Sequence, residues 1–545
     1  MKRRFLCVLF TFIFISTWVR GNHLVVSGGE EYPLIFPGTG TKNIRVSVHL
    51  DTLSSGVELY AIVKKAKGGE VIGEKFVKLD TGLHHDLPID FEFPQWGYYR
   101  YEVQLRDIIK GTVIDSVSTS IAIVPERQEI GPSDFGTCTH FGHFKGSVPY
   151  GLDLIRLAGF SSIRDEIFWD RVEQKPGVFS FDPRYDRYVD AAVERDIRVL
   201  MILDYGNPLP GEKTAHGFPL DDSGRKRFAR YAEEMVTRYK DKIFLWELWN
   251  EPSKALGIDP GTSYFELLKE VYPVIKSVQP QGEFICSGGA PNLVDGAYVN
   301  PIFKRGGASF MDGFAMHTYV APYGPEDGYE TKGHPFLKNV SVPSLWPHYG
   351  KMAEQQSDGK NKQLDVWITE MGWHLADSLP TSKGESLFID EYRQAAYITR
   401  LFLLARRYHT TKCVYLYDFQ NDGVDLKEKE HNFGIIRKDF SPKAAYPAVA
   451  VLSHLLAEKK FTRALQETTD TKVFCYGEGK EEVIALWSVN RYWEPLESHS
   501  KTISLDIGRK KIGLIDWQGQ KTVMESVTGK YTLPISENPS FIVYE

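Results

Sequence analysis

Two glutamates, Glu251 and Glu370, stand where acid–base and nucleophilic chemistry could occur. Glu251 lies in the run LWELWNEP directly after Asn250, and Glu370 ends the run LDVWITE. Cleavage of a glycosidic bond needs two carboxyls across one cleft: a protonated one that donates to the leaving oxygen, and an ionised one that attacks the anomeric carbon. Similar side chains take these opposite roles when their environments separate their pKa values. The pair predicts glycoside cleavage if the fold brings the two glutamates together.

Other interpretations of these acids have to be weighed. Glu251 alone could be a carboxylate at a helix N-terminus, stabilised by the helix dipole. Asn250 and Pro252 beside it, together with the second glutamate, favour the catalytic interpretation. Glu247 lies in the middle of its predicted strand and faces the interior of the fold. Because a buried carboxylate must be paired, we expect an ion pair there, with Arg164 as the candidate partner, and no catalytic role.

The elements that position these residues alternate between strand and helix from 128 to 459. Apolar segments are each followed by a helical pattern, which is typical of βα units around a parallel sheet. The segments 225–240 and 385–408 are the clearest amphipathic helices. Eight units predict a (β/α)8 TIM barrel, in which catalytic residues lie at the C-terminal ends of the strands. The predicted strands are 135–140, 161–164, 198–204, 243–250, 283–289, 313–318, 364–370 and 412–418.

Short alternating strands flank the barrel on both sides. The N-terminal part, 22–127, predicts a β-sandwich, and the C-terminal part, 460–545, predicts a second, smaller β-sandwich. The fold class is therefore α/β, a barrel between two sandwiches. The strands expected in the first sandwich are 43–50, 57–65, 97–105 and 116–124, and those in the second are 471–477, 482–489, 510–517, 521–527 and 541–544.

The first 21 residues predict a signal peptide. Three basic residues, Lys2 to Arg4, precede an apolar run from 5 to 19, which is the pattern of a secretory signal. The alternative is an uncleaved membrane anchor, but the run is shorter than the roughly 20 residues that a span needs. We expect a secreted or periplasmic protein without stable membrane insertion after cleavage.

Composition excludes several classes of protein. The 545 residues carry 65 Lys and Arg against 71 Asp and Glu, a net charge of −6, which argues against a nucleic-acid binder. The cysteines beyond residue 21 lie in strand-like runs, where we expect buried thiols, although one bridge stays open. Their spacing does not suggest zinc, and we expect no metal and no cofactor. Oligomeric state is left open. These cysteines are Cys138, Cys286, Cys413 and Cys475.

The runs LWELWNEP and WITEMGW resemble the two signature strands of clan A glycoside hydrolases, which are retaining enzymes on (β/α)8 barrels. The resemblance implies that Glu251 is the acid/base and Glu370 the nucleophile. It also implies that Asn250 contacts the 2-hydroxyl of the sugar.

Three further residues match the same clan. The run AMHTY resembles its His-x-Tyr motif, which would make His317 and Tyr319 active-site residues, with Tyr319 bonded to the nucleophile. Arg164 matches an arginine near the nucleophile in some member families.

Within the clan, family 39 and its relatives are the most similar. YLYDFQNDG (415–423) and EHNFGIIRKDFSPKAAYPA (430–448) resemble the last strand and helix of that family, and the resemblance covers 135–545. Tyr417 departs from the Trp that several clan A families carry on strand eight, which puts the sugar platform in doubt. The family includes enzymes on xylosides, uronic-acid glycosides and polysaccharides, so it does not identify the substrate.

Further side chains at strand ends are candidates for substrate contact. His140 follows the first strand, and Asp204 and Tyr205 follow the third, where a loop-capping role for Asp204 is equally plausible. Aromatic rings stack on sugars but also fill protein cores. The candidate platforms are Trp169, Trp373 and Tyr417.

Together these features predict a retaining glycoside hydrolase that acts on a β-linked carbohydrate by double displacement. Two alternatives stay open. The barrel could be a catalytically inactive carbohydrate-binding protein, which carboxyls too far apart or a loop at 321–351 that plugs the barrel mouth would favour. The same residues could also serve a transglycosylase.

Overall fold

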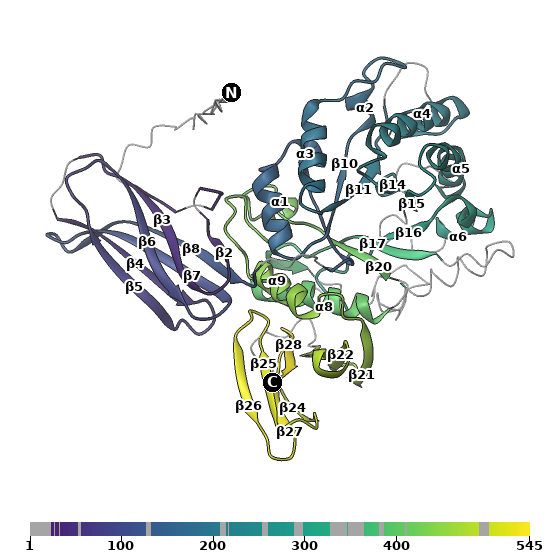
Figure 1. The fold of residues 1–545 in the computed structure, drawn as a ribbon. Helices are drawn as coiled ribbons and strands as arrows, with labels where there is room; N and C mark the ends of the chain where they lie inside the picture. The colour runs from purple at the N-terminus through teal and green to yellow at the C-terminus, as the bar shows by residue number, and fades with distance from the viewer. Residues whose placement is uncertain are drawn as a thin grey trace, which may run out of the picture. The chain divides into compact units, whose positions relative to one another are not determined.

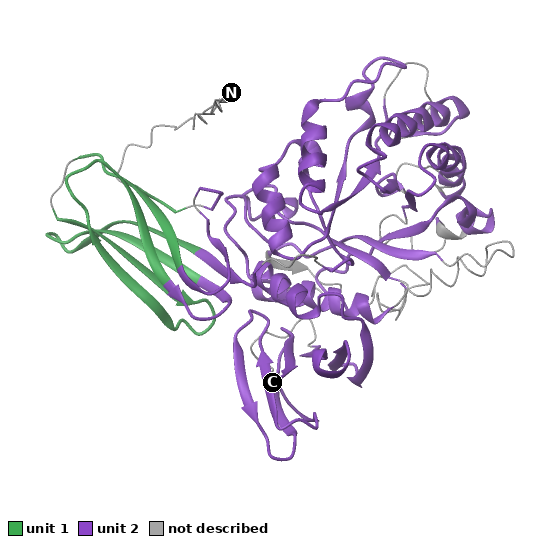
Figure 2. Cartoon of the chain, in the orientation of Figure 1, with its two compact units in different colours: residues 1–26, 42–91, 100–119 green, residues 27–41, 92–99, 120–545 purple. Residues whose placement is uncertain are grey.

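The computed structural model describes most of the chain. The predicted signal peptide and most of 321–351 lie outside the described residues. The chain divides into two compact units: 1–26, 42–91 and 100–119 form one, and 27–41, 92–99 and 120–545 form the other (Figure 2). The domain limits read from the sequence stay predictions. The described residues are 23–26, 28–31, 33–52, 56–126, 132–207, 214–215, 217–252, 260–287, 298–326, 346, 364–380, 386–408, 411–489 and 501–545.

A closed barrel of eight parallel strands forms the centre of the second unit (Figure 1). Each strand lies within a few residues of a predicted one, so the predicted TIM barrel is confirmed. The order around the barrel is β10-β11-β14-β15-β16-β17-β20-β9. The bounds are β9 (Phe135–Cys138), β10 (Ser162–Glu166), β11 (Arg198–Leu203), β14 (Leu245–Leu248), β15 (Glu283–Cys286), β16 (Gly313–His317), β17 (Asp365–Met371) and β20 (Thr411–Leu416).

Apolar side chains fill the barrel interior, as expected for strands covered on both faces. One buried cluster brings together Leu200 on β11, Trp367 on β17 and Tyr415 on β20. Gly136 on β9 lies opposite Tyr415, and a Cβ at this glycine would lie 2.6 Å from that ring. The absence of a side chain at 136 therefore makes room for the tyrosine.

Helices cover the outside of the barrel (Figure 1). Three of them begin at an aspartate whose side chain accepts a backbone N–H of the first turn: Asp182 before α3, Asp221 before α4 and Asp390 before α8. Such caps satisfy donors that the helix itself leaves unpaired. The helices are α1 (Val148–Leu157), α2 (Trp169–Val172), α3 (Pro183–Val193), α4 (Asp222–Tyr239), α5 (Pro260–Val278), α6 (Val299–Lys304), α8 (Glu391–Arg407) and α9 (Ala445–Leu456).

The N-terminal strands form a three-stranded sheet, β1-β3-β6, and a five-stranded sheet, β2-β8-β7-β4-β5. On β7, buried and more exposed residues alternate along most of the strand, which is typical of a sheet with one face in a core. The bounds are β1 (His23–Val25), β2 (Ile35–Pro37), β3 (Gly40–His49), β4 (Val57–Lys65), β5 (Val71–Lys78), β6 (His84–Phe93), β7 (Gly97–Asp107) and β8 (Thr112–Val124).

The C-terminal strands form a six-stranded sheet, β21-β22-β23-β28-β25-β26, and a pair, β24-β27. Both contribute to one apolar core, in which Leu486 and Ile542 of the larger sheet meet Leu533 of the pair. The predicted second sandwich is therefore present. The bounds are β21 (Phe461–Glu467), β22 (Thr471–Tyr476), β23 (Val483–Ser488), β24 (Lys501–Asp506), β25 (Lys511–Ile515), β26 (Lys521–Glu525), β27 (Lys530–Ile535) and β28 (Ser540–Tyr544).

The cysteines match the expectation of buried thiols and not the alternative of a disulfide bridge. Cys138, Cys286, Cys413 and Cys475 are buried free thiols. Among the described residues, no helix combines the length and the apolar composition that crossing a membrane requires.

Candidate active site

The C-terminal ends of the barrel strands surround a cavity of about 470 Å³. Asn250 and Glu251 reach it from the end of β14, Glu370 from β17 and Arg164 from β10. Residues that are far apart in the sequence therefore meet at one barrel mouth, as the parallel arrangement of the strands requires.

The two predicted catalytic carboxyls face each other in this cavity. One carboxylate oxygen of Glu251 and one of Glu370 lie within 4.8 Å of each other and of a ring nitrogen of His317. The side chain of Glu251 is 31% exposed and that of Glu370 is 10% exposed. This close approach fits a retaining pair, whose carboxyls usually lie about 5–5.5 Å apart, better than the wider spacing of an inverting site.

Two donors hold the carboxylate of Glu370. Arg164 Nη1 donates to its Oε1 at 2.7 Å, and the Tyr319 hydroxyl donates to its Oε2 at 2.8 Å. Bonds to an ionised acceptor are strong and directional, so this pair of donors sets the orientation of the carboxylate toward the cavity. Burial, and then the charge of Glu370, raise the pKa of Tyr319 far above its usual value, which keeps the hydroxyl protonated as a donor.

Arg164 connects the nucleophile to two other residues. Its Nε donates to Glu247 Oε2 at 2.6 Å, and its Nη2 donates to Asn250 Oδ1 at 3.0 Å. The predicted ion pair between Glu247 and Arg164 is thereby confirmed. One guanidinium, 3% exposed, orients Glu370 and Asn250 together.

The backbone around Glu251 adopts a conformation that residues other than glycine rarely take. Trp249 has φ +64° and Glu251 has φ +46°, in the left-handed region. Such strained residues gather at functional sites, where the surrounding structure holds them in place. Glu251 lines the cavity, and His317 Nδ1 lies 3.0 Å from its Oε1.

His317 lies between both carboxyls. It is buried, with Nδ1 3.5 Å from Glu370 Oε2 and Nε2 3.0 Å from the Thr369 hydroxyl. Burial opposes the charged imidazole, but the negative charge of Glu370 and the bond to Glu251 outweigh it, so the pKa of His317 is raised.

Asn250 lies beside Tyr205 at the edge of the cavity. Its amide nitrogen donates to the Tyr205 hydroxyl at 2.7 Å, while its amide oxygen accepts from Arg164. Both side chains line the cavity, and the Asn250 amide nitrogen carries a second hydrogen that it can donate.

His140 and Tyr417 also line the cavity. His140 Nδ1 lies 3.1 Å from Asp422 Oδ1; burial lowers its pKa, but Asp422 and Asp418 more than compensate and raise it to about 9. Tyr417 packs edge-on against Tyr319 at 6.2 Å between ring centroids. Tyr417 thus lies at the cavity, and its contact with a sugar stays a prediction.

Two of the three candidate sugar platforms lie in the core. Trp373 and Trp169 are fully buried. The indole of Trp373 donates to the Tyr323 carbonyl, and that of Trp169 donates to Glu173. Trp373, just after β17, packs against Tyr397 on α8. Trp169, the first residue of α2, packs against Phe228 and Tyr231 on α4, so both rings fill the core. Asp204 is likewise fully buried and does not line the cavity.

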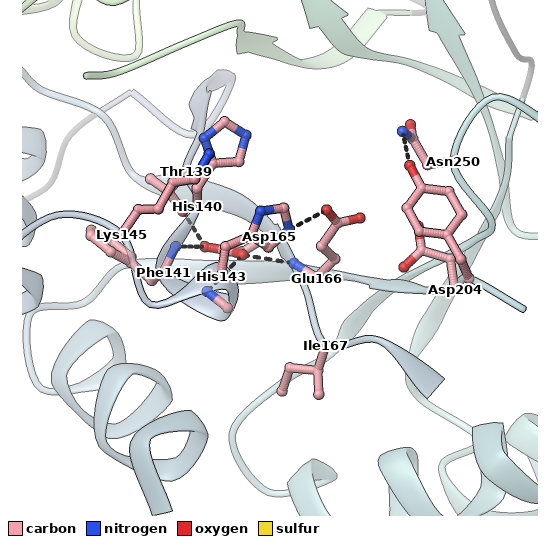
Figure 3. A network of polar contacts seen from close by, with 12 residues as sticks. Thr139, His140, Phe141, His143, Lys145, Asp165, Glu166, Ile167, Asp204 and Asn250 are labelled. Atoms are coloured by element: carbon pink, nitrogen blue, oxygen red, sulfur yellow. Dashed lines mark hydrogen bonds and ion pairs between the residues drawn. The ribbon is translucent and has the colours of Figure 1, made fainter. Parts of the chain in front are cut away.

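Sequence reasoning missed a polar network on the β10 side of the cavity (Figure 3). Asp165 accepts from the Thr139 hydroxyl at 2.6 Å and from backbone N–H groups of the loop after β9. Glu166 and His143 line the cavity, and His143 Nε2 lies 2.6 Å from Glu166 Oε1. Asp165 and Glu166, the two acidic residues at the end of β10, could have indicated this network from the sequence, since polar residues at a strand end face the barrel mouth.

Within the part of the chain that the structure describes, two groups of side chains present metal-ligand atoms close together: His140, Asp418 and Asp422, and the set formed by Glu251, His317 and Glu370. Lys145 already places a cation 2.8 Å from Asp422, which weakens the first group as a metal site. The second group is the catalytic candidate itself. The expected absence of a metal stays a prediction.

Comparisons with known proteins agree with this geometry. A family model described as "Cellulase (glycosyl hydrolase family 5)" matches residues 127–404. The structure of a family 39 glycoside hydrolase from the gut symbiont Bacteroides cellulosilyticus WH2 is 30% identical, with a TM-score of 0.81 over 94% of this chain and 99% of its own. No curated protein matches the chain.

Two more distant structures are also similar. A GH2 β-galacturonidase from Eisenbergiella tayi is 16% identical, over 82% of this chain and 73% of its own. Bacteroides uniformis β-glucuronidase 2 is 12% identical, over 96% and 58%. Both have a TM-score of 0.40, too low for either to carry an argument.

Proposed function

Because this chain is a clan A glycoside hydrolase, most similar to family 39 and its relatives, and therefore a retaining glycosidase, we propose that it hydrolyses β-linked oligo- or polysaccharides with Glu370 as nucleophile and Glu251 as acid/base. The observation that carries these roles is the approach of the two carboxyls within 4.8 Å across one cavity.

In the first step, Glu370 attacks the anomeric carbon and forms a glycosyl-enzyme. Arg164 and Tyr319, which bond its two oxygens, aim the carboxylate at that carbon. Glu251 gives its proton to the leaving glycosidic oxygen, so that the bond to the leaving group breaks without producing an alkoxide. Asn250 donates to the sugar, through a bond that strengthens as positive charge develops on the ring.

In the second step, Glu251 acts as a base. It removes a proton from a water molecule, which attacks the anomeric carbon and releases Glu370. The configuration at that carbon is retained because it is inverted twice. Each turnover returns to Glu251 the proton that it gave away.

The β-linkage and the polymeric substrate rest on resemblance. The matching family model is named for cellulases, whose substrate is a β-linked polymer. His140, Tyr417 and Glu166 line the cavity beside the carboxyls and are the groups positioned to select the sugar. A panel of α- and β-aryl glycosides and polysaccharides identifies the linkage and the sugar.

The roles of the two glutamates are tested by Glu370→Ala and Glu251→Ala. We expect Glu370→Ala to abolish turnover, and azide, which can occupy the space left by the carboxylate, to restore part of it. Glu251→Ala should slow cleavage most for substrates whose leaving groups need a proton. Glu233→Ala, on the exposed side of α4, is the control. Full activity in both cavity variants would disprove the roles.

Transglycosylation remains a second candidate outcome, since it uses the same glycosyl-enzyme with a sugar as acceptor. Product analysis in water distinguishes the two reactions. Widely separated carboxyls would have favoured an inactive binding barrel, and the close approach of Glu251 and Glu370 gives it no such support.

The N-terminal sandwich offers little to a glycan. Among the described Phe, Tyr and Trp residues from 23 to 126, one side chain, that of Phe76, is exposed. The Tyr60 ring beside it lies under the Arg106 guanidinium, 3.8 Å from it. A row of exposed aromatic rings, which would favour glycan binding, is not found there. Export of the protein, which rests on residues 1–21, stays part of the proposal.

A further inference from the structure

A chain of hydrogen bonds runs behind the cavity from Arg164 to Glu251. Arg164 Nε bonds Glu247 Oε2, and the Thr369 hydroxyl lies 3.2 Å from Glu247 Oε1. On its other side, Thr369 contacts His317 Nε2 at 3.0 Å, and His317 Nδ1 faces Glu251 Oε1 at 3.0 Å. Glu247 and Thr369 are fully buried and His317 is 1% exposed, so water does not compete for these bonds.

The direction of each bond follows from the donors available. Glu247 is an ion-paired carboxylate and has only lone pairs to offer. The single hydrogen of the Thr369 hydroxyl must therefore point to Glu247, which leaves a lone pair of its oxygen toward His317 Nε2. An acceptor at that distance requires a hydrogen on Nε2.

From this order we infer that Glu247 and Thr369 are positioning residues that fix the Nε2-protonated form of His317, so that His317 Nδ1 and Glu251 share one proton. This inference rests on the acid/base role proposed for Glu251. It gives Glu247 and Thr369 a part in the reaction although neither lines the cavity.

The consequence for Glu251 depends on Nδ1. When His317 is neutral, Nδ1 carries a lone pair, and Glu251 must bring the hydrogen of their bond; the acid is then held protonated. The opposite tautomer would place the hydrogen on Nδ1, which would donate to Glu251 and favour its ionised form. A buried unpaired acceptor is costly, so the bond network selects the form of Glu251 that the first step needs.

The same arrangement supports the second step. After Glu251 has given its proton to the leaving oxygen, its carboxylate faces the lone pair of His317 Nδ1, and two acceptors then lie 3.0 Å apart. Their repulsion is relieved when Glu251 takes a proton from the attacking water. One proton leaves the pair in the first step and one returns in the second, so the cycle balances.

The charges around His317 come from several elements. Glu370 on β17 is negative and Arg164 on β10 is positive, Glu251 beyond β14 acts through its hydrogen bond to Nδ1, and Glu247 acts through Thr369. Burial and Arg164 lower the pKa of His317, but Glu370 and the bond to Glu251 outweigh them and raise it. This favours retention of one proton between His317 and Glu251.

The test compares Thr369→Val with Thr369→Ser in the full chain. Valine has nearly the shape of threonine but lacks the hydroxyl, whereas serine keeps it. The first readout is the ¹⁵N spectrum of histidine-labelled protein, in which His317→Asn identifies the signal of His317. We expect a hydrogen on Nε2 in the wild type and in Thr369→Ser, and a change of protonation at Nε2 in Thr369→Val.

The second readout is kinetic. Thr369→Val should lower kcat/KM about 10–100-fold for glycosides with poor leaving groups, a sizeable part of what general acid catalysis contributes. A dinitrophenyl glycoside, whose departure needs no proton, should change much less. The alkaline limb of the pH profile should move to lower pH, and Thr369→Ser should return it to its wild-type position.

The outcomes separate this inference from the proposed function. A wild-type His317 without a hydrogen on Nε2 overturns the inference, and so does a Thr369→Val spectrum identical to that of the wild type. These spectra need no substrate, so they decide even if no glycoside is cleaved, and the wild-type spectrum decides even if Thr369→Val does not fold. Unaltered activity in Glu251→Ala would instead contradict the proposed function, but the spectra would still report the tautomer of His317.

Discussion

At the scale of single residues, the geometry of the cavity depends on the shape of one guanidinium. Arg164 donates in three directions, to Glu247, Glu370 and Asn250. Lysine carries the same charge, but its ammonium is a compact group that cannot reproduce a planar fork. Both the orientation of Glu370 and the pairing of the buried Glu247 therefore depend on the identity of residue 164.

This dependence gives a first prediction, for Arg164→Lys. We expect kcat/KM to fall on the order of 10²-fold, comparable to the loss of one donor at a catalytic anion, and the melting temperature to fall because a buried carboxylate loses a partner. Arg184→Lys is the control, since the Arg184–Asp182 pair is exposed. Steady-state kinetics and thermal unfolding measure both effects; equal behaviour of the two variants would contradict the argument.

At the scale of elements, the loop after β9 is held against β10 by one carboxylate. Asp165 accepts from the Thr139 hydroxyl and from the backbone N–H groups of Phe141, Gly142 and Glu166. A Cβ on Gly142 would lie 1.8 Å from the Glu166 carbonyl oxygen, so glycine is needed for this approach. The bonds position His140 and His143 at the cavity (Figure 3).

The second prediction concerns Asp165→Asn. The amide places an NH₂ group against backbone donors, which leaves at least one of them unpaired in a buried site. We expect a loss of about 2–4 kcal/mol in the free energy of unfolding, measured by denaturant titration. Asp153→Asn, in an exposed pair with Arg195, should cost less than about 1 kcal/mol. If Asp165→Asn lost as little stability as the control Asp153→Asn, the loop would not depend on the Asp165 carboxylate.

At the scale of the whole molecule, the barrel and the C-terminal sandwich share buried polar contacts. Glu326, which follows β16, accepts from Arg400 Nε on α8 at 2.9 Å and from the indole N–H of Trp487 on β23 at 2.7 Å. The Tyr476 hydroxyl on β22 donates to the Leu403 carbonyl on α8 at 2.8 Å. These contacts indicate that the two parts unfold together.

The third prediction follows for Trp487→Phe, which removes the N–H donor and keeps an aromatic ring. We expect a loss of about 1–3 kcal/mol and one common calorimetric transition for barrel and sandwich, shifted to lower temperature. Val523→Ala, at an exposed position of β26, should shift it little. Two separate transitions, of which only one moves, would show that the parts are independent.

The sequence by itself determined the barrel and the strand ends at which Glu251 and Glu370 lie. Strand periodicity, helix patterns and strand-end motifs are local signals, and eight of them in succession admit few folds. The same reasoning predicted the ion pair of Glu247 with Arg164, because a charge on an inward-facing position needs a partner.

Only the tertiary structure decided which aromatic rings reach the cavity and which fill the core. Trp373 and Tyr417 both follow barrel strands, yet only Tyr417 lines the cavity. The link from Glu247 through Thr369 to His317 was equally hidden, since it joins three strands whose register no local pattern specifies. Burial and hydrogen-bond direction depend on residues distant in sequence, and for that reason they follow from packing and not from composition or spacing.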